Sequence, residues 1–148
     1  MLNFAVNTQT TMEIKQKSML PGHLIYEIDI TNRESVVFIN SIKARNLKGF
    51  CWLWMNLPRI IRSVKRHHGA YECIPALVSP VQVVMVSYWY GYGELGDYYK
   101  GEYHQSFSRF VAKHPQALGM FFEHFPAERS GKYINGVFGL GRNFRRKG

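Results

Sequence analysis

The chain has 148 residues and a formal net charge of +9 at pH 7, and 46% of its residues are hydrophobic. A chain of this length folds as one domain with its own core, and this apolar content excludes an intrinsically disordered protein. No apolar run approaches the roughly twenty residues that span a bilayer, and the first residues lack the basic start and apolar block of a secretory signal. We therefore expect a cytoplasmic protein with no membrane partner.

Turn residues and alternation divide the first part of the chain. Residues 1–22 are polar, follow no hydrophobic period and end at Pro21-Gly22, so we expect a flexible N-terminal arm. Residues 23–30 alternate apolar and polar side chains, which predicts a short edge strand, and residues 31–35 have the composition of a turn. Residues 36–44, VVFINSIKA, are rich in β-branched and aromatic side chains and form the next predicted strand.

A change of period at Phe50 predicts an amphipathic helix that ends near residues 67–69. Its apolar residues recur at steps of three and four: Phe50, Leu53, Trp54, Leu57, Ile60, Ile61 and Val64. Pro58 lies inside this helix, removes a backbone donor and crowds the preceding turn. We therefore expect a kink, or two helical pieces that meet near Asn56.

The second half of the chain repeats this alternation of strand and helix. Residues 71–79 and 81–90 are extended runs separated by Ser79-Pro80, which predicts an antiparallel hairpin, and Pro75 places the first run at a sheet edge. Residues 94–101 and 102–114 are predicted helices interrupted at Gly101, and they share one predicted buried stripe: Tyr99, Tyr103, Phe107, Phe110 and Val111. Residues 117–125 form the last predicted strand, followed by a glycine-rich aromatic segment, 132–141, and a basic C-terminal tail, 142–148.

This order of elements predicts an α+β fold, a ferredoxin-like βαββαβ subunit over residues 23–141. The strand at 81–90 is apolar on both faces, because Val83 and Met85 alternate with Val84 and Val86. Two helices cover one face, and a second copy of the sheet is the simplest cover for the other. The sequence therefore predicts a homodimer, a dimeric α/β barrel.

The positive charge gathers in three places rather than in a nucleic-acid motif. Lys43, Arg45 and Lys48 follow a strand, while Arg59, Arg62 and Arg66 share one face of the first helix, and the tail is basic. This pattern is typical of a solvated face, so we expect no nucleic-acid partner, although a positive field favours anionic ligands such as carboxylates. A basic module that binds an acidic partner is the alternative.

The cysteines and histidines follow no metal-binding pattern. Cys51 and Cys73 have the spacing of neither a metal clip nor a disulfide framework, and we expect two reduced thiols. His67 and His68 are adjacent at a helix end, where a C-terminal cation position is the simpler interpretation. No His-x-x-x-His or Cys-x-x-Cys spacing occurs, so no metal site is predicted.

Six segments resemble, in their order, a small monooxygenase-like family related to haem aldoxime dehydratases and, more distantly, to antibiotic-biosynthesis-type monooxygenases. They are ESVVFINSIKARN, WLWMNLPRIIRSVKRH, VVMVSYW, GELGDYYKGEYHQSFSRF, LGMFFEH and YINGVFGLG, which together extend over residues 34–141. The family has the dimeric α/β barrel of ferredoxin-like subunits. The resemblance further implies a small-molecule pocket between sheet and helices, and chemistry performed with haem or with no cofactor.

The resemblance points to two histidines. The family's histidine in the second helix matches His104, whereas its tryptophan-histidine-glutamate run on the last strand is replaced here by Phe121, Phe122 and Glu123, followed by His124. This departure puts haem ligation in doubt and leaves a haem-dependent and a cofactor-free site both open. Phe122 and His124 share one face of the strand, so His124 is the second candidate.

We therefore expect His104 or His124 to be the catalytic group or a haem ligand, because an imidazole exchanges protons near neutral pH. The predicted walls of the pocket are Trp54, Tyr88, Trp89, Tyr98 and Phe122, for which core or dimer interface is the alternative. The predicted function is a monooxygenase-like oxidoreductase or a lyase that acts on a hydrophobic metabolite, with or without a carboxylate. A haem-dependent aldoxime-dehydratase-like lyase and a non-catalytic small-ligand binding protein are the alternatives.

Overall fold

The computed structural model describes residues 14–16, 25–28, 35–127, 131–135 and 138–142. The central elements, in chain order, are β3 (Val36–Ala44), α1 (Leu47–Arg66), β4 (Ala70–Ser79), β5 (Gln82–Trp89), α2 (Tyr92–Lys100), α3 (Glu102–Lys113) and β6 (Leu118–Pro126). Three short strands, β1 (Ile14–Gln16), β2 (Ile25–Ile28) and β7 (Gly131–Ile134), form a separate sheet.

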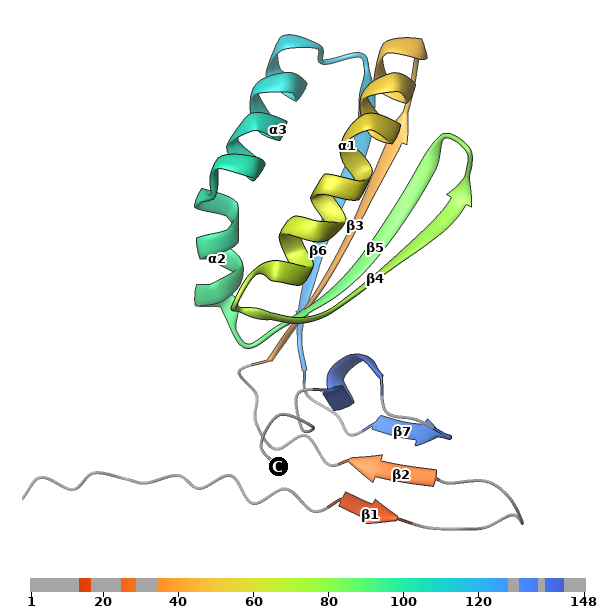
Figure 1. The fold of residues 1–148 in the computed structure, drawn as a ribbon, viewed down its shortest axis with the longest axis vertical. Helices are drawn as coiled ribbons and strands as arrows, with labels where there is room; N and C mark the ends of the chain where they lie inside the picture. Colours follow the sequence, from red (N-terminus) through yellow and green to blue (C-terminus); the bar gives the residue numbers. More distant parts are fainter. Residues whose placement is uncertain (1–13, 17–24, 29–34, 128–130, 136–137, 143–148) are drawn as a thin grey trace, which may run out of the picture.

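The main sheet confirms the predicted ferredoxin-like arrangement. Its four strands lie in the order β4-β5-β3-β6, and every neighbouring pair is antiparallel. Figure 1 shows α1, α2 and α3 on one side of this sheet. The strand at 36–44 agrees with the prediction, the hairpin of β4 and β5 is confirmed, and β4, which contains Pro75, is an edge strand.

The helix-facing side of the sheet forms the core. Alternate residues of β3 and β5 point under the helices, so Phe38, Ile42 and Met85 are buried there. Leu53 of α1 is completely buried against this side. The sheet and helices therefore enclose a core in two adjoining clusters, one under α1 and α3 and one under α2.

Helix α1 runs without interruption through Pro58, so the expectation of two helical pieces is wrong. Its N-terminus is capped by Asn46, whose Oδ1 accepts a hydrogen bond from the Gly49 N–H at 2.9 Å. Leu53 and Leu57 on one half and Val64 on the other are buried on the same sheet. Burial of this continuous apolar face holds both halves together although Pro58 removes one backbone donor.

Helices α2 and α3 are separated at Gly101, as predicted. The predicted buried stripe is wrong at Tyr103, which is exposed, and at no position of α3 is a residue fully buried. The half-buried residues of α3 are His104, Phe107, Phe110 and Val111. Helix α3 therefore packs on the sheet only in part, and His104 lies on the side of α3 that faces the sheet.

The second sheet has the order β1-β2-β7 and lies beyond the end of the main sheet where β3 begins (Figure 1). Of the predicted N-terminal arm, only β1 is among the described residues. The strand predicted at 23–30 is present in its described part as β2, but its predicted edge position is wrong, because β2 lies between β1 and β7 and pairs with both. Within the predicted 132–141 segment, Gly139 has a φ of +55° and approaches the Tyr88 hydroxyl so closely that an added Cβ would lie 2.9 Å from it. Residues 143–148 of the predicted tail lie outside the described residues.

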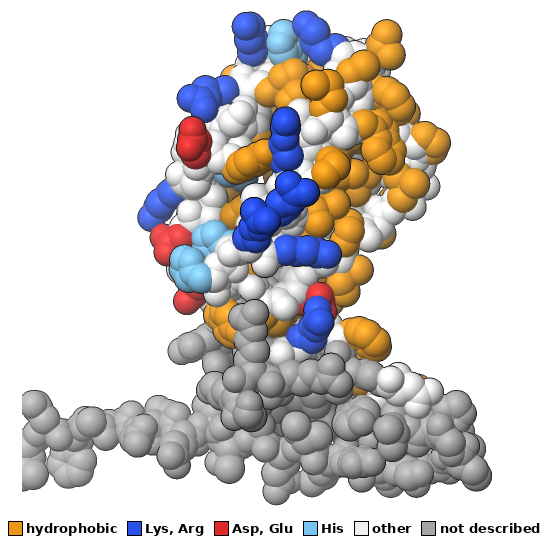
Figure 2. Space-filling model, viewed as in Figure 1, with side chains coloured by type: hydrophobic (Ala, Val, Ile, Leu, Met, Phe, Trp, Pro, Cys, Tyr) orange, Lys and Arg blue, Asp and Glu red, His pale blue; other side chains and the backbone are white. Residues whose placement is uncertain are grey.

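The opposite side of the main sheet carries apolar side chains without a helix over them. Ile74 of β4 pairs with Val86 of β5, and Ile74 is 42% exposed in the single chain. Phe121 and Phe125 of β6 lie on the same side, because they pair with Ser41 and Val37 of β3, which point away from the helices. Both phenylalanines are exposed. Figure 2 shows hydrophobic side chains gathered over the β4 and β5 side of the molecule and Lys and Arg side chains along α1.

Candidate functional site

A cavity opens between the inner side of α3, the C-terminal half of α2 and the helix-facing side of β3 and β6. Its inner part has a volume of about 30 Å³ and is lined by Phe38, Asn40, Ile42, Ile60, Tyr98, Tyr99, Tyr103, His104, Phe107 and Phe122. An outer groove of about 460 Å³ is lined by Tyr99, His104, Phe107, Ser108, Val111, Ala112, Met120 and Phe122. The two parts share Tyr99, His104, Phe107 and Phe122, so they adjoin one another.

His104 lies where the inner cavity meets the outer groove. Its ring packs edge-on against Tyr99, with the centroids 4.6 Å apart, and lies tilted against Phe107 at 6.0 Å. Burial lowers the pKa of His104 below its ordinary value of 6.5, because these aromatic neighbours replace water that would solvate the charged ring. The imidazole is therefore neutral at pH 7 and has one nitrogen free to accept a proton.

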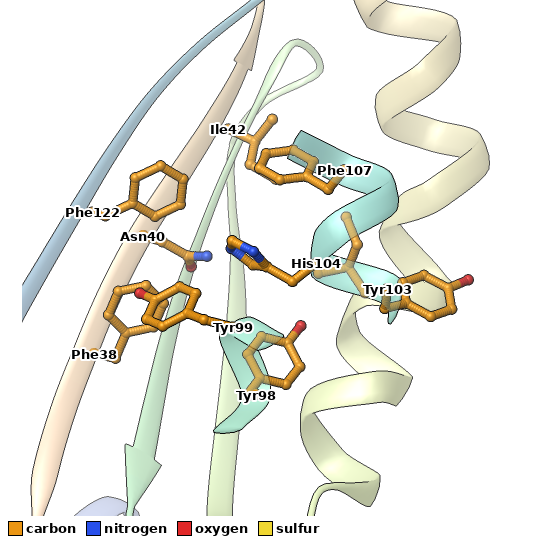
Figure 3. A pocket seen from close by; sticks show the side chains of 10 residues that line it. Phe38, Asn40, Ile42, Tyr98, Tyr99, Tyr103, His104, Phe107 and Phe122 are labelled. Carbon is orange, nitrogen blue, oxygen red and sulfur yellow. The ribbon is translucent and has the colours of Figure 1, made fainter. Parts of the chain in front are cut away.

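Asn40 of β3 is the second polar group of the cavity. In Figure 3 its amide and the His104 imidazole point toward one another from opposite walls. Asn40 Oδ1 is buried and has no hydrogen-bond partner within the described structure. A buried carbonyl without a partner costs about 1–3 kcal/mol, so this atom is a strong candidate to accept a hydrogen bond from a ligand.

The sequence analysis missed Asn40, although the sequence carries a signal for it. The helix-facing positions of β3 are Val36, Phe38, Asn40, Ile42 and Ala44, and asparagine is the one polar residue among them. A polar side chain in the middle of an apolar strand face is uncommon unless it has a partner or a function.

Aromatic rings form the remaining walls. Phe38 and Phe122, on neighbouring strands, are nearly parallel, with an interplanar angle of 3° and centroids 6.2 Å apart. Tyr99 meets Phe38 edge-on at 5.7 Å. Burial raises the pKa of Tyr99 to about 12, so its phenol is protonated at neutral pH. The cavity therefore combines flat apolar walls with neutral polar groups.

The structure brings together only part of the predicted site. Of the predicted site residues, His104, Tyr98 and Phe122 line the inner cavity. Trp89 is 0% exposed and belongs to the core, where its Nε1–H donates to Ser87 Oγ at 2.9 Å. Trp89 is therefore a core residue, which was the alternative interpretation of this side chain.

Three other predicted site residues lie away from the cavity. Trp54 is on the outer side of α1, where its Nε1–H donates to the Pro80 carbonyl at 2.9 Å. Tyr88 pairs with Val37 on the side of the sheet away from the helices, so it points away from the cavity. His124 is on the helix-facing side but lies nearer the end of β6, exposed and edge-on to Tyr92 at 5.4 Å.

The lining of the cavity fits a neutral organic ligand better than haem. None of the residues that line its two parts is Asp, Glu, Lys or Arg. His104 would supply one nitrogen ligand to the iron, but the lining offers no cation for the two propionate carboxylates of a haem. Within the described ranges, no three His, Cys, Asp or Glu side chains gather as a metal site. Nor does that part of the chain include a helix that is long and apolar enough to cross a bilayer.

No family model and no curated protein matches the sequence. Solved structures do match. A mutant of SnoaB, a cofactor-independent oxygenase from Streptomyces nogalater, is 11% identical and has a TM-score of 0.50 over 65% of this chain and 95% of that chain. A protein from Deinococcus radiodurans that is provisionally named an antibiotic biosynthesis monooxygenase is 14% identical, with a TM-score of 0.53 over 64% of this chain and 93% of that chain.

A third match, PA3566 from Pseudomonas aeruginosa, is 15% identical and has a TM-score of 0.52 over 64% of this chain and 95% of that chain. At these identities the likeness shows the fold and leaves the reaction open. It agrees with the topology of the main sheet and with the fold that the resemblance of the sequence implied. The chain thus has the α+β ferredoxin-like subunit fold that monooxygenase-like proteins of this type share.

Proposed function

We propose that this protein is a small-molecule enzyme of the monooxygenase-like type, and that it binds a hydrophobic substrate in the groove between α3 and β6. The observation that carries the proposal is the juxtaposition of His104 and Asn40 in an aromatic cavity. A pocket that is mostly apolar and has a few convergent polar groups is typical of an active site. The names of the structures with the same fold agree with this chemistry.

In the proposed mechanism, His104 acts as the general base. Its lowered pKa keeps the imidazole neutral, so it can take a proton from an acidic C–H of a substrate whose polar group is held at the inner cavity. The aromatic walls keep water away from this step, and molecular oxygen accepts the electrons of the deprotonated carbon. The O–O bond breaks, one oxygen atom becomes the carbonyl oxygen on that carbon, and the other leaves as water with the two protons that the carbon has lost. Asn40 holds the reacting end of the substrate in place.

We also propose that the active form is a homodimer whose subunits pack through the uncovered side of the main sheet. Ile74, Phe121 and Phe125 are exposed there in a single chain. An apolar surface of this kind on a soluble protein is typical of an interface. The helix-facing groove lies on the other side of the sheet, so such a dimer leaves both grooves accessible.

The enzyme proposal is tested by oxygen uptake with a panel of flat, hydrophobic molecules that carry an acidic C–H or O–H group. We expect uptake with the native chain and a loss of at least about 100-fold in His104→Ala, the scale of general-base catalysis. His68→Ala is the matched control, because His68 is exposed at the end of α1. Equal turnover in His104→Ala and the native chain would contradict the assignment of His104, and binding without turnover across the panel would favour a non-catalytic binding protein.

A further inference from the structure

We propose that the ligand is a neutral, flat molecule that inserts an O–H or N–H donor into the inner cavity and donates a hydrogen bond to Asn40 Oδ1. This inference names the class of ligand that the groove binds. It rests on the proposed function only because both concern the same site. It also decides against the carboxylate-bearing ligand that the net charge of the chain favoured.

The shape of the cavity separates a small head group from a larger body. The inner part, about 30 Å³, has room for a group of the size of a water molecule. The outer groove, about 460 Å³, is in the range of pockets that hold a small organic ligand. His104 and Phe122 line both parts, so a ligand whose body lies in the groove places its head between His104 and Asn40.

The polar chemistry of the inner cavity selects the head group. Asn40 Oδ1 is an acceptor without a partner, so a ligand that donates a hydrogen bond removes a desolvation cost that an apolar ligand leaves in place. A site built around such a buried group discriminates strongly against an analogue that lacks the matching group. The selected head group is therefore a donor.

Charge excludes an anionic head group. No Lys or Arg lines either part of the cavity, although the chain carries 19 such residues. A carboxylate there would lose its water without gaining a cation. The cations of α1, Arg59, Arg62 and Arg66, are exposed on the helix and are not among the lining residues.

The walls favour a flat body. The rings of Phe38 and Phe122 are nearly parallel on adjacent strands and together present an apolar platform on the sheet. Phe107 and Tyr99 face this platform from the helices. Aromatic rings on two sides are typical of sites for planar apolar molecules.

The test is isothermal titration of the full chain at pH 7.5 with three probes of one shape: 2-naphthol, naphthalene and 2-naphthoate. We expect 2-naphthol to bind at least about tenfold more tightly than the other two, a difference of about 1.4 kcal/mol. Asn40→Leu keeps the volume of the side chain but removes the acceptor. In this variant we expect 2-naphthol to lose its advantage over naphthalene, whereas Gln105→Ala, an exposed change on α3, leaves the ranking as it is.

The ranking on the native chain decides the inference even if Asn40→Leu does not fold. Tighter binding of 2-naphthoate, or equal binding of all three probes, would overturn it, and so would a preference for 2-naphthol that survives in Asn40→Leu. Absence of binding by every probe would overturn the inference as well. The predicted ranking without oxygen uptake by any substrate of the panel would support the inference and contradict the enzyme proposal, whereas uptake together with a preference for 2-naphthoate would do the reverse.

Discussion

The Tyr98 hydroxyl lies 3.0 Å from Ser63 Oγ and joins α2 to α1. The Ser63 hydroxyl donates in turn to the Ile60 carbonyl at 2.7 Å, so Tyr98 is the donor to Ser63. Burial raises the pKa of Tyr98, which keeps this phenol protonated. Tyr98, which lines the inner cavity, is therefore held in place by a hydrogen bond between α2 and α1.

Replacement of this hydroxyl tests the contact. We expect Tyr98→Phe to lower the free energy of unfolding by about 0.5–1.5 kcal/mol, the usual net worth of such a hydrogen bond. Urea denaturation measures the change, with Tyr103→Phe as a control because Tyr103 is exposed. An equal effect of both variants would contradict a structural role for the bond between Tyr98 and Ser63.

Two glycines of the helices are expected to respond in opposite directions. A Cβ at Gly49 in the first turn of α1 would collide with the backbone carbonyl of Ala117, so Gly49→Ala forces α1 away from the start of β6. Gly96 lies inside α2 with open space at its Cβ position, and Gly96→Ala is expected to stabilise the protein by roughly 0.5–1 kcal/mol. Thermal unfolding should give a lower midpoint for Gly49→Ala and a higher one for Gly96→Ala. A midpoint that does not fall in Gly49→Ala would show that α1 has room to move, and a lower midpoint in Gly96→Ala would contradict the open space at that position.

The stability of the protein should decrease as the pH falls below about 6.5, the value for an unperturbed histidine. Burial lowers the pKa of His104 in the folded state, so the unfolded chain binds a proton at a higher pH than the folded chain does. Proton binding then stabilises the unfolded chain and lowers the free energy of unfolding. The effect is absent well above pH 6.5 and levels off once the pH lies below the folded pKa. His67, whose pKa is lowered by burial and by His68, contributes with the same sign.

Denaturant titrations at several pH values between 7.5 and 5 measure this dependence. We expect a weaker dependence in His104→Gln than in the native chain, because the replacement removes one ring whose pKa burial lowers. A native chain whose stability rises as the pH falls through this range would contradict the burial of both rings.

The proposed homodimer gives a fourth prediction. Val86 lies in the middle of the uncovered side of the sheet, beside Ile74 and opposite Ile39. A charge there would be buried between two sheets, so Val86→Glu is expected to convert the dimer to a monomer in light scattering coupled to size exclusion. Arg62→Glu, an exposed change on α1, is the control. A native chain that elutes as a monomer at micromolar concentration would contradict the interface.

Most of the fold could be predicted from the sequence, because hydrophobic period and turn residues are local. The strand at Val36–Ala44, the hairpin and the break between α2 and α3 at Gly101 follow from patterns within a few residues. The division into two helical pieces, one of the two outcomes expected at Pro58, did not occur, since the tertiary burial of Leu53, Leu57 and Val64 outweighs the loss of one helical hydrogen bond.

The candidate site was predicted less completely, because lining a cavity depends on which side of an element faces which neighbour. His104, Tyr98 and Phe122 were found from their residue types and from the resemblance. Trp89 has the same composition signal but faces a closed part of the core, and Tyr88 faces the other side of the sheet. Asn40 was overlooked although it is the one polar residue on the helix-facing side of β3, because no local pattern shows that this side of the strand lines a cavity beneath α3.

The sequence by itself determined the elements of the main sheet and its helices, their order, the ferredoxin-like topology and an aromatic-rich domain with a histidine on its last helix. These follow from periodicity and turn chemistry along a short stretch of chain. Only the tertiary structure decided that α3 stands off the sheet, that Asn40 and His104 meet in the space beneath it, and that no cation enters that space. The physical reason is that burial, desolvation and an unpaired hydrogen-bond acceptor belong to groups that are distant in the chain and become neighbours only on folding.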